Sequence, residues 1–89
     1  MALDNIEIKK MKAKAHALEP VVRIGKNGLT DSIVQQVKRV LLARKLVKVR
    51  LLRSFVESND RKKTAKELAV KTGAELIDQV GFTVVLYKR

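Results

Sequence analysis

The 89-residue sequence contains no cysteine and no tryptophan, and its aromatic side chains are limited to Phe55, Phe82 and Tyr87. Without cysteine the chain has no disulfide, no thiol nucleophile and no sulfur ligand for zinc. Proteins that stack single-stranded bases need a set of exposed aromatic rings, which this sequence does not supply. No apolar run approaches the roughly 20 residues that cross a bilayer, and the N-terminus has no signal-peptide hydrophobic region. We therefore expect a cytoplasmic protein with no membrane partner, no metal and no cofactor.

Residues suited to catalysis are also scarce. The single histidine, His16, has no second histidine and no cysteine to act with, whereas a nucleophile needs an adjacent base and zinc needs several ligands. A triphosphate-binding loop would have the pattern G-x-x-x-x-G-K-[ST], but here Gly28 is followed by Leu29 and Thr30. We therefore expect neither an enzyme nor a small-molecule substrate.

Positive charge is what the chain has in excess. Twenty Lys and Arg residues stand against nine Asp and Glu, which gives a formal net charge of +11. The hydrophobic content of 46% is ordinary for a folded protein, and the length suits a single domain over residues 1–89. Because an excess of one sign repels itself unless a polyanion neutralises it, nucleic acid is the expected partner.

The stretch 21–32 carries the most specific local pattern. A short β-branched segment, residues 21–24, leads into a two-glycine turn and then into a helix start; the turn is Gly25, Lys26, Asn27 and Gly28. Glycine permits backbone angles and close approaches that a Cβ would prevent. A helix N-terminus attracts anions, and Lys26 adds a full positive charge there. The pattern predicts a loop that holds a backbone phosphate, with an ordinary strand-to-helix turn as the alternative, because two such glycines often occur by chance.

Hydrophobic periodicity predicts the element order α-β-α-β-α-β-β. The helices are expected near residues 5–18, 30–44 and 60–72, and the strands at 21–24, 46–53, 74–80 and 82–88. The long crossover between the first two strands favours a parallel pair, and the short link at Gly81 favours an antiparallel hairpin. The predicted fold is therefore of the α/β kind, an α+β two-layer sandwich with a four-stranded mixed sheet.

The first predicted helix combines an apolar face with a cluster of lysines. Its apolar face is formed by Ile8, Met11, Ala15 and Leu18, and its lysines are Lys9, Lys10, Lys12 and Lys14. Because these lysines have no acidic partners among them, they repel one another, which favours a role facing an anion over an ordinary solvated surface. Arg23 extends the positive surface onto the first strand, with Lys48 and Arg50 on the second strand as further candidates.

Residues 15–30, AHALEPVVRIGKNGLT, resemble the signature of the CRM domain, the chloroplast RNA splicing and ribosome maturation family whose stand-alone bacterial members are called YhbY. Three later segments are similar as well: 46–50, 72–75 and 81–87. The resemblance implies RNA binding and a fold like that of the C-terminal domain of the third bacterial translation initiation factor. It also implies that residues 25–28 act like the loop of KH domains. The composition of residues 51–63 departs from the family pattern, so no contact is carried over there.

Together these features predict a monomer that binds structured RNA, with ribosomal RNA or pre-ribosomal particles in large-subunit assembly as the expected target. The expected RNA-binding residues are Gly25, Lys26, Asn27, Gly28, Lys9, Lys10, Lys12, Lys14 and Arg23. Low sequence specificity is expected because no base-stacking set is visible. Two alternatives are an Alba-like duplex-DNA chromatin protein and an adaptor that binds acidic proteins. The duplex-DNA protein would prefer DNA or bind both nucleic acids equally, and the adaptor would bind nucleic acid weakly with little dependence on salt.

Overall fold

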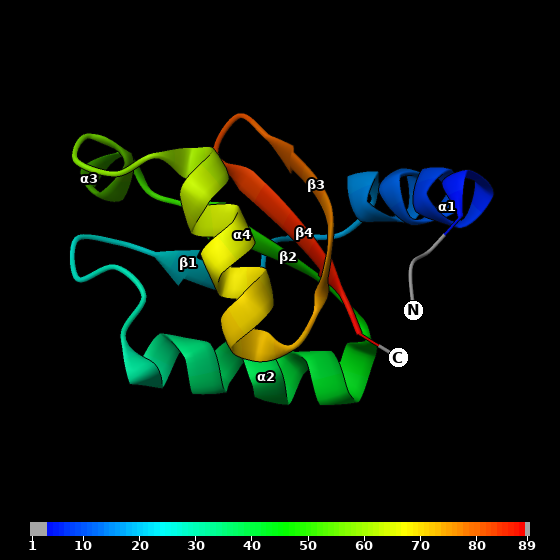
Figure 1. Ribbon diagram of the computed structural model, residues 1–89, viewed down its shortest axis with the longest axis horizontal. Coiled ribbons are helices and arrows are strands. Elements are labelled where there is room, and N and C mark those ends of the chain that lie inside the picture. Colours follow the sequence, from blue (N-terminus) through cyan, green and yellow to red (C-terminus); the bar gives the residue numbers. More distant parts are fainter. Residues whose placement is uncertain (1–3, 89) are drawn as a thin grey trace.

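The computed structural model describes residues 4–88 and contains a four-stranded mixed sheet with helices on both faces (Figure 1). In chain order the elements are α1 (Asn5–His16), β1 (Val22–Ile24), α2 (Asp31–Arg44), β2 (Leu46–Leu51), α3 (Arg53–Val56), α4 (Arg61–Thr72), β3 (Glu75–Val80) and β4 (Thr83–Tyr87). The predicted order is confirmed, with the short helix α3 in addition. Of the expected domain, residues 1–3 and 89 lie outside the described residues.

The sheet has the strand order β1-β2-β4-β3. Strands β1 and β2 run parallel, with Val22 opposite Val49, whereas β4 pairs antiparallel with both β2 and β3. The parallel pair and the antiparallel hairpin are therefore confirmed. The β3–β4 pairing shifts register between Leu76 and Asp78, an irregularity that re-aims the side chains of the bulged strand.

Helices α2 and α4 cover one face of the sheet and enclose the main core. Fully buried side chains from the strands and these helices meet there, among them Ile24, Val37, Leu41, Val49, Leu68 and Leu86. On α4 the buried residues include Ala65, Leu68, Ala69 and Thr72, at the spacing of an amphipathic helix. On α2 the buried residues are Val34, Val37 and Leu41, while Ile33 and Val40 are half-buried. Within residues 4–88 no helix is long and apolar enough to span a bilayer.

Helix α1 packs on the other face of the sheet, over a smaller cluster. Ala15 is buried there against Ile77 of β3 and Val85 of β4, and the half-buried side chains packed around them are Ile8, Met11, Leu46 and Tyr87. The helix ends at His16, two residues earlier than expected. The Lys48 ammonium donates to the Ala15 and Leu18 carbonyl oxygens at 3.1 and 3.4 Å, so a positive charge stabilises the carbonyl end of this helix.

Each long helix begins at a side chain that accepts a backbone hydrogen bond. Asp4 caps α1, Thr30 caps α2 and Asp60 caps α4. The Asp60 carboxylate accepts from the backbone N–H groups of Lys63 and Lys62, and these bonds, the one from Lys63 foremost, hold the pKa of Asp60 below its ordinary value. Such caps satisfy donors that a helix start leaves unpaired.

The segment after β2 differs from the prediction. The second strand was expected to extend through residue 53, but it ends at Leu51. The single turn of α3 then forms in a segment for which no helix was expected. Its Phe55 ring is buried in the main core with 4% exposure. The single helical turn places this ring beneath the loop that follows β1.

Candidate nucleic-acid interface

The glycine loop, residues 25–28, leaves the carboxyl end of β1 and turns tightly. The Gly28 N–H donates to the Gly25 carbonyl oxygen at 2.9 Å, which closes the turn. Next to it, the Leu52 N–H donates to the Ile24 carbonyl oxygen at 2.9 Å. The loop is therefore held against the segment that leads into α3, and these two hydrogen bonds fix its backbone conformation.

Of the two loop glycines, Gly28 is the one whose backbone conformation favours glycine. Gly28 has a φ of +71°, in the left-handed region that favours glycine. A Cβ at Gly28 would stand 3.4 Å from Cε1 of Phe55, and a Cβ at Gly25 would stand 3.4 Å from Cδ1 of Leu52. The loop therefore lies against Leu52 and the Phe55 ring of α3, and a Cβ at either glycine would make an ordinary van der Waals contact there.

The outer side of the glycine loop offers donors and positive charge. Lys26 and Asn27 are exposed, and within residues 4–88 their backbone N–H groups have no hydrogen-bond partner. The loop and the first turn of α2 line a hollow of about 350 Å³. Unpaired N–H groups beside a lysine at a helix N-terminus suit an anionic oxygen ligand such as a phosphate. The exposed carboxylate of Asp31, in the first turn of α2, opposes this attraction in part.

The four lysines predicted on the first helix are all exposed on α1: Lys9, Lys10, Lys12 and Lys14. They do not converge with the glycine loop. Figure 1 shows the turn between β1 and α2 at one end of the molecule and α1 at the other, along a longest dimension of 34 Å. The loop and the α1 lysines therefore form two separate groups.

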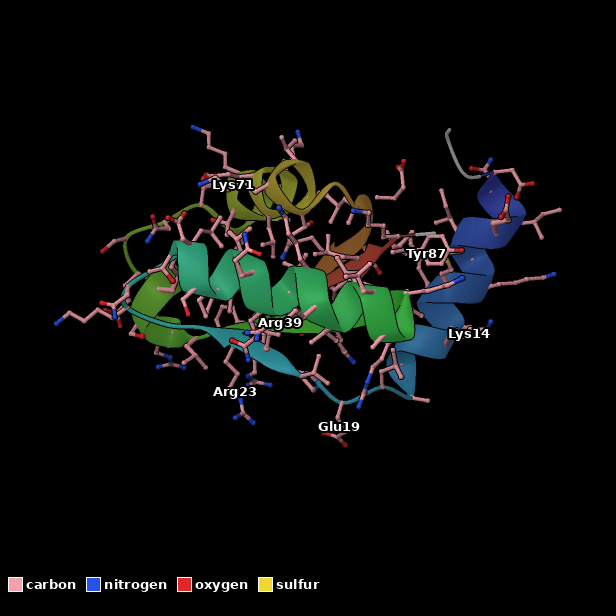
Figure 2. All side chains as sticks on the ribbon, turned by 90° about the horizontal axis from the view of Figure 1, so that it is seen from below. Lys14, Glu19, Arg23, Arg39, Lys71 and Tyr87 are labelled. Carbon is pink, nitrogen blue, oxygen red and sulfur yellow. The ribbon has the colours of Figure 1, made fainter. Side chains whose placement is uncertain are left out.

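Two arginines lie on the face of the sheet that α2 and α4 leave uncovered. Arg23 of β1 is directly opposite Arg50 of β2, and both side chains are exposed. Within the described part of the chain neither guanidinium forms a hydrogen bond or an ion pair. Figure 2 shows Arg23 on the opposite side of the molecule from Lys71 of α4, with Lys14 at the far end. Two adjacent, unpaired guanidinium groups suit a phosphate, because each can donate two parallel N–H bonds to phosphate oxygens.

Lys48, the other strand cation that we considered, has a different role. It is half-buried and its ammonium group is bound to the end of α1. The alternating pattern of β2 predicts the face on which Lys48 lies, but not the helix terminus that reaches it. The sequence analysis also missed α3 as the support of the glycine loop, because four residues carry too weak a periodic signal.

Acidic side chains neutralise little of this charge. Among residues 4–88 the one ion pair joins Lys71 to Glu67 at 3.4 Å, and Lys63, which precedes Glu67 by one helical turn, forms none. No group of three or more His, Asp or Glu side chains in that range could hold a metal ion. The groups on the loop, on α1 and on the part of the sheet face that α1 leaves exposed are therefore suited to bind anions.

Comparison with known proteins gives a consistent assignment. A family model of the CRS1 / YhbY (CRM) domain matches residues 3–88. The chain is 36% identical over 78 residues to the "Probable RNA-binding protein YqeI" of Bacillus subtilis, an alignment that covers 88% of this chain and 79% of that protein. It is 30% identical over 89 residues to the "Probable RNA-binding protein PA4753" of Pseudomonas aeruginosa, covering 100% of this chain and 84% of the relative.

A solved structure is also similar. The solution structure of the hypothetical protein SAV1595 from Staphylococcus aureus superposes with a TM-score of 0.82 at 28% sequence identity. The match covers 99% of this chain and 90% of that one. The arrangement of helices around a mixed four-stranded sheet is therefore shared with a protein whose structure was determined experimentally.

Proposed function

Because the chain belongs to the CRS1 / YhbY (CRM) domain family, we propose that it is an RNA-binding protein. Two relatives are named probable RNA-binding proteins. The observation that carries the proposal is the set of exposed cations on the loop, on α1 and on the sheet, which neighbouring acids leave largely unpaired. Binding rather than catalysis is the role proposed.

The glycine loop is the proposed clamp on the RNA backbone. Gly25 and Gly28 keep the surface low, so that a sugar-phosphate chain can approach the main chain closely. The unpaired N–H groups of Lys26 and Asn27 donate to one phosphate, and the Lys26 ammonium neutralises it. This geometry supports the proposal because the donors are unpaired in a turn that the bond from the Gly28 N–H to the Gly25 carbonyl oxygen closes.

The other cations extend the proposed contact over the length of the molecule. Arg23 binds phosphate on the uncovered sheet face, and the exposed lysines of α1 bind it at the far end: Lys9, Lys10, Lys12 and Lys14. Because the groups lie at opposite ends of a 34 Å axis, a folded RNA that presents phosphates at a fixed separation fits better than a flexible strand. Ribosomal RNA or a pre-ribosomal particle in large-subunit assembly, bound by a monomer in the cytoplasm, is the proposed setting.

The test compares a folded ribosomal RNA fragment with duplex DNA of equal length, each titrated with the protein at several salt concentrations. We expect tighter binding to the RNA and a steep loss of affinity with salt, because each neutralised phosphate adds about 0.7–0.9 to the slope of log K against log salt. Equal or tighter binding to the duplex DNA would favour the Alba-like alternative. Weak binding with little salt dependence would favour an adaptor for acidic proteins.

A further inference from the structure

A small hollow of about 150 Å³ lies between the carboxyl-terminal half of α1 and the sheet, on the face opposite α2 and α4. We call it the α1–sheet hollow. Its apolar walls are Ala15, Val80 and Val85, and its polar lining includes His16, Lys48 and Asp78. The volume is below the roughly 300–1,000 Å³ of pockets that hold drug-sized ligands. It therefore suits a single ring system.

One donor and one acceptor in this hollow are incompletely used. The Lys48 ammonium has three N–H donors and gives two of them to the carbonyl oxygens of Ala15 and Leu18. The Asp78 carboxylate accepts from the Gln79 N–H at 3.0 Å and forms no ion pair with any residue of the described range. Because a carboxylate has about four acceptor positions, both groups can still bind a ligand.

The apolar part of the hollow is open to solvent in a strongly cationic neighbourhood. Val80 is 65% exposed, although it lies on a strand face that packs against α1 elsewhere. Lys12 lines the hollow from α1, and Arg50 of β2 is directly opposite Thr83, another lining residue. A nucleotide with its ring in the hollow would therefore have cations for its phosphates on both sides.

We propose that the α1–sheet hollow receives one unpaired base of the bound RNA and that its polar pair favours guanine; this inference rests on the proposed function. Guanine offers two adjacent donors, N1–H and N2–H, to the Asp78 carboxylate and the O6 acceptor to the Lys48 ammonium. Uracil offers one donor, N3–H, and the carbonyl oxygens on either side of it are repelled by the carboxylate. The base must be unpaired, because pairing occupies the same edge. Sequence preference then arises without an aromatic stacking platform.

The experiment uses four RNA hairpins that are identical except for one bulged nucleotide, G, A, C or U, and measures the Kd of the full chain for each. The parent protein is expected to bind the G bulge at least about fivefold more tightly than the U bulge, the lower end of what a good two-point base contact contributes. Asp78→Asn keeps an oxygen for the Gln79 N–H but replaces the second carboxylate oxygen with a donor. It is therefore expected to lose the preference for G.

Glu75→Gln is the matched control, because it removes the same charge from the same strand outside the hollow, and it should keep the preference. If the parent binds all four bulges tightly and equally, the base site is wrong and the proposed RNA-binding function stands. The same conclusion follows if Asp78→Asn keeps the full preference for G. If no hairpin binds, both the proposed function and the base site are wrong.

Discussion

The two ends of the molecule carry positive charge in opposite ways. At the loop end a single exposed lysine, Lys26, sits on a backbone that is closed by a hydrogen bond and packed against Phe55. At the α1 end four exposed lysines stand on a helix that rests on the small cluster around Ala15. The loop end therefore depends on shape and the α1 end on the number of charges. A substitution that changes the backbone shape should abolish RNA binding at the loop end. Binding at the α1 end should instead weaken stepwise as each lysine is removed.

The largest effect on binding is expected from Gly28→Asp. Asp is one of the few residues that tolerate the left-handed backbone region, so the chain should still fold. The new carboxylate would face the phosphate that the loop is proposed to hold. Two like charges 4 Å apart repel by about 4 kcal/mol near a protein surface and by about 1 kcal/mol in bulk water. We therefore expect the Kd for structured RNA to rise by at least about tenfold, measured by fluorescence anisotropy.

Gly73→Asp is the control for that experiment. Gly73 has a φ of +69°, close to the +71° of Gly28, and lies after α4, where a Cβ would meet only the flexible end of the Lys88 side chain. The control adds the same charge and similar backbone strain outside the loop. Comparable melting temperatures with a loss of affinity in Gly28→Asp alone would place the function in the loop. Equal affinities would reduce the loop to a connector.

Most of the fold could be predicted from the sequence because its signals are local. Alternation in β2, the three- and four-residue spacing in α4 and the glycine at the hairpin each decide one element without knowledge of the rest. Helix α3 could not be predicted in this way. It is one turn long, and its Phe55 is held by burial in the main core beside Gly28, which is distant in the sequence.

The second effect concerns the charge of α1. The double variant Lys10→Gln with Lys14→Gln removes two exposed lysines that lie four residues apart. If each neutralises one phosphate, the slope of log K against log salt should fall by about 1.4–1.8. Titrations of the same RNA at four or more salt concentrations measure this slope.

The matched pair Lys62→Gln with Lys66→Gln has the same spacing and exposure on α4. Helix α4 covers the opposite face of the sheet from α1, so this pair should leave the slope nearly unchanged. An equal fall in both double variants would mean that net charge alone, rather than the α1 end, attracts the RNA.

A third effect concerns how firmly α1 is held. Lys48→Met keeps the apolar stem of the side chain but removes the donor that binds the Ala15 and Leu18 carbonyl oxygens. Bonds to charged groups contribute about 1.5–3 kcal/mol when well formed. Because one of these is long and the site is half-exposed, we expect a loss of about 1 kcal/mol in the free energy of unfolding, measured with urea.

Arg50→Met on the same strand is the control, because the Arg50 side chain has no partner within residues 4–88. It should leave the unfolding free energy within about 0.5 kcal/mol of the parent, as is usual at surface positions. A loss in Arg50→Met as large as in Lys48→Met would show that the bonds to α1 add nothing.

The candidate site was less predictable than the fold. The loop and the lysines of α1 could be proposed from residue types, but their separation by most of the length of the molecule depends on the face of the sheet that α1 covers. The α1–sheet hollow joins residues of four elements, such as Ala15 and Asp78. No local sequence pattern connects these residues. The small number of aromatic side chains also led us to expect low sequence specificity, so a site for one base was not predicted.

The smallest effect is expected from Lys26→Ala, although this lysine is the one full charge of the loop. The unpaired N–H groups of residues 26 and 27 remain in the variant, because they belong to the backbone. The salt slope should therefore fall by no more than about 0.7–0.9, one phosphate, and by less than in the α1 double variant. Lys63→Ala, an exposed lysine on α4, should leave it unchanged. If Lys26→Ala weakens binding more than Gly28→Asp does, the loop acts through its charge like α1, and the contrast between the two ends is wrong.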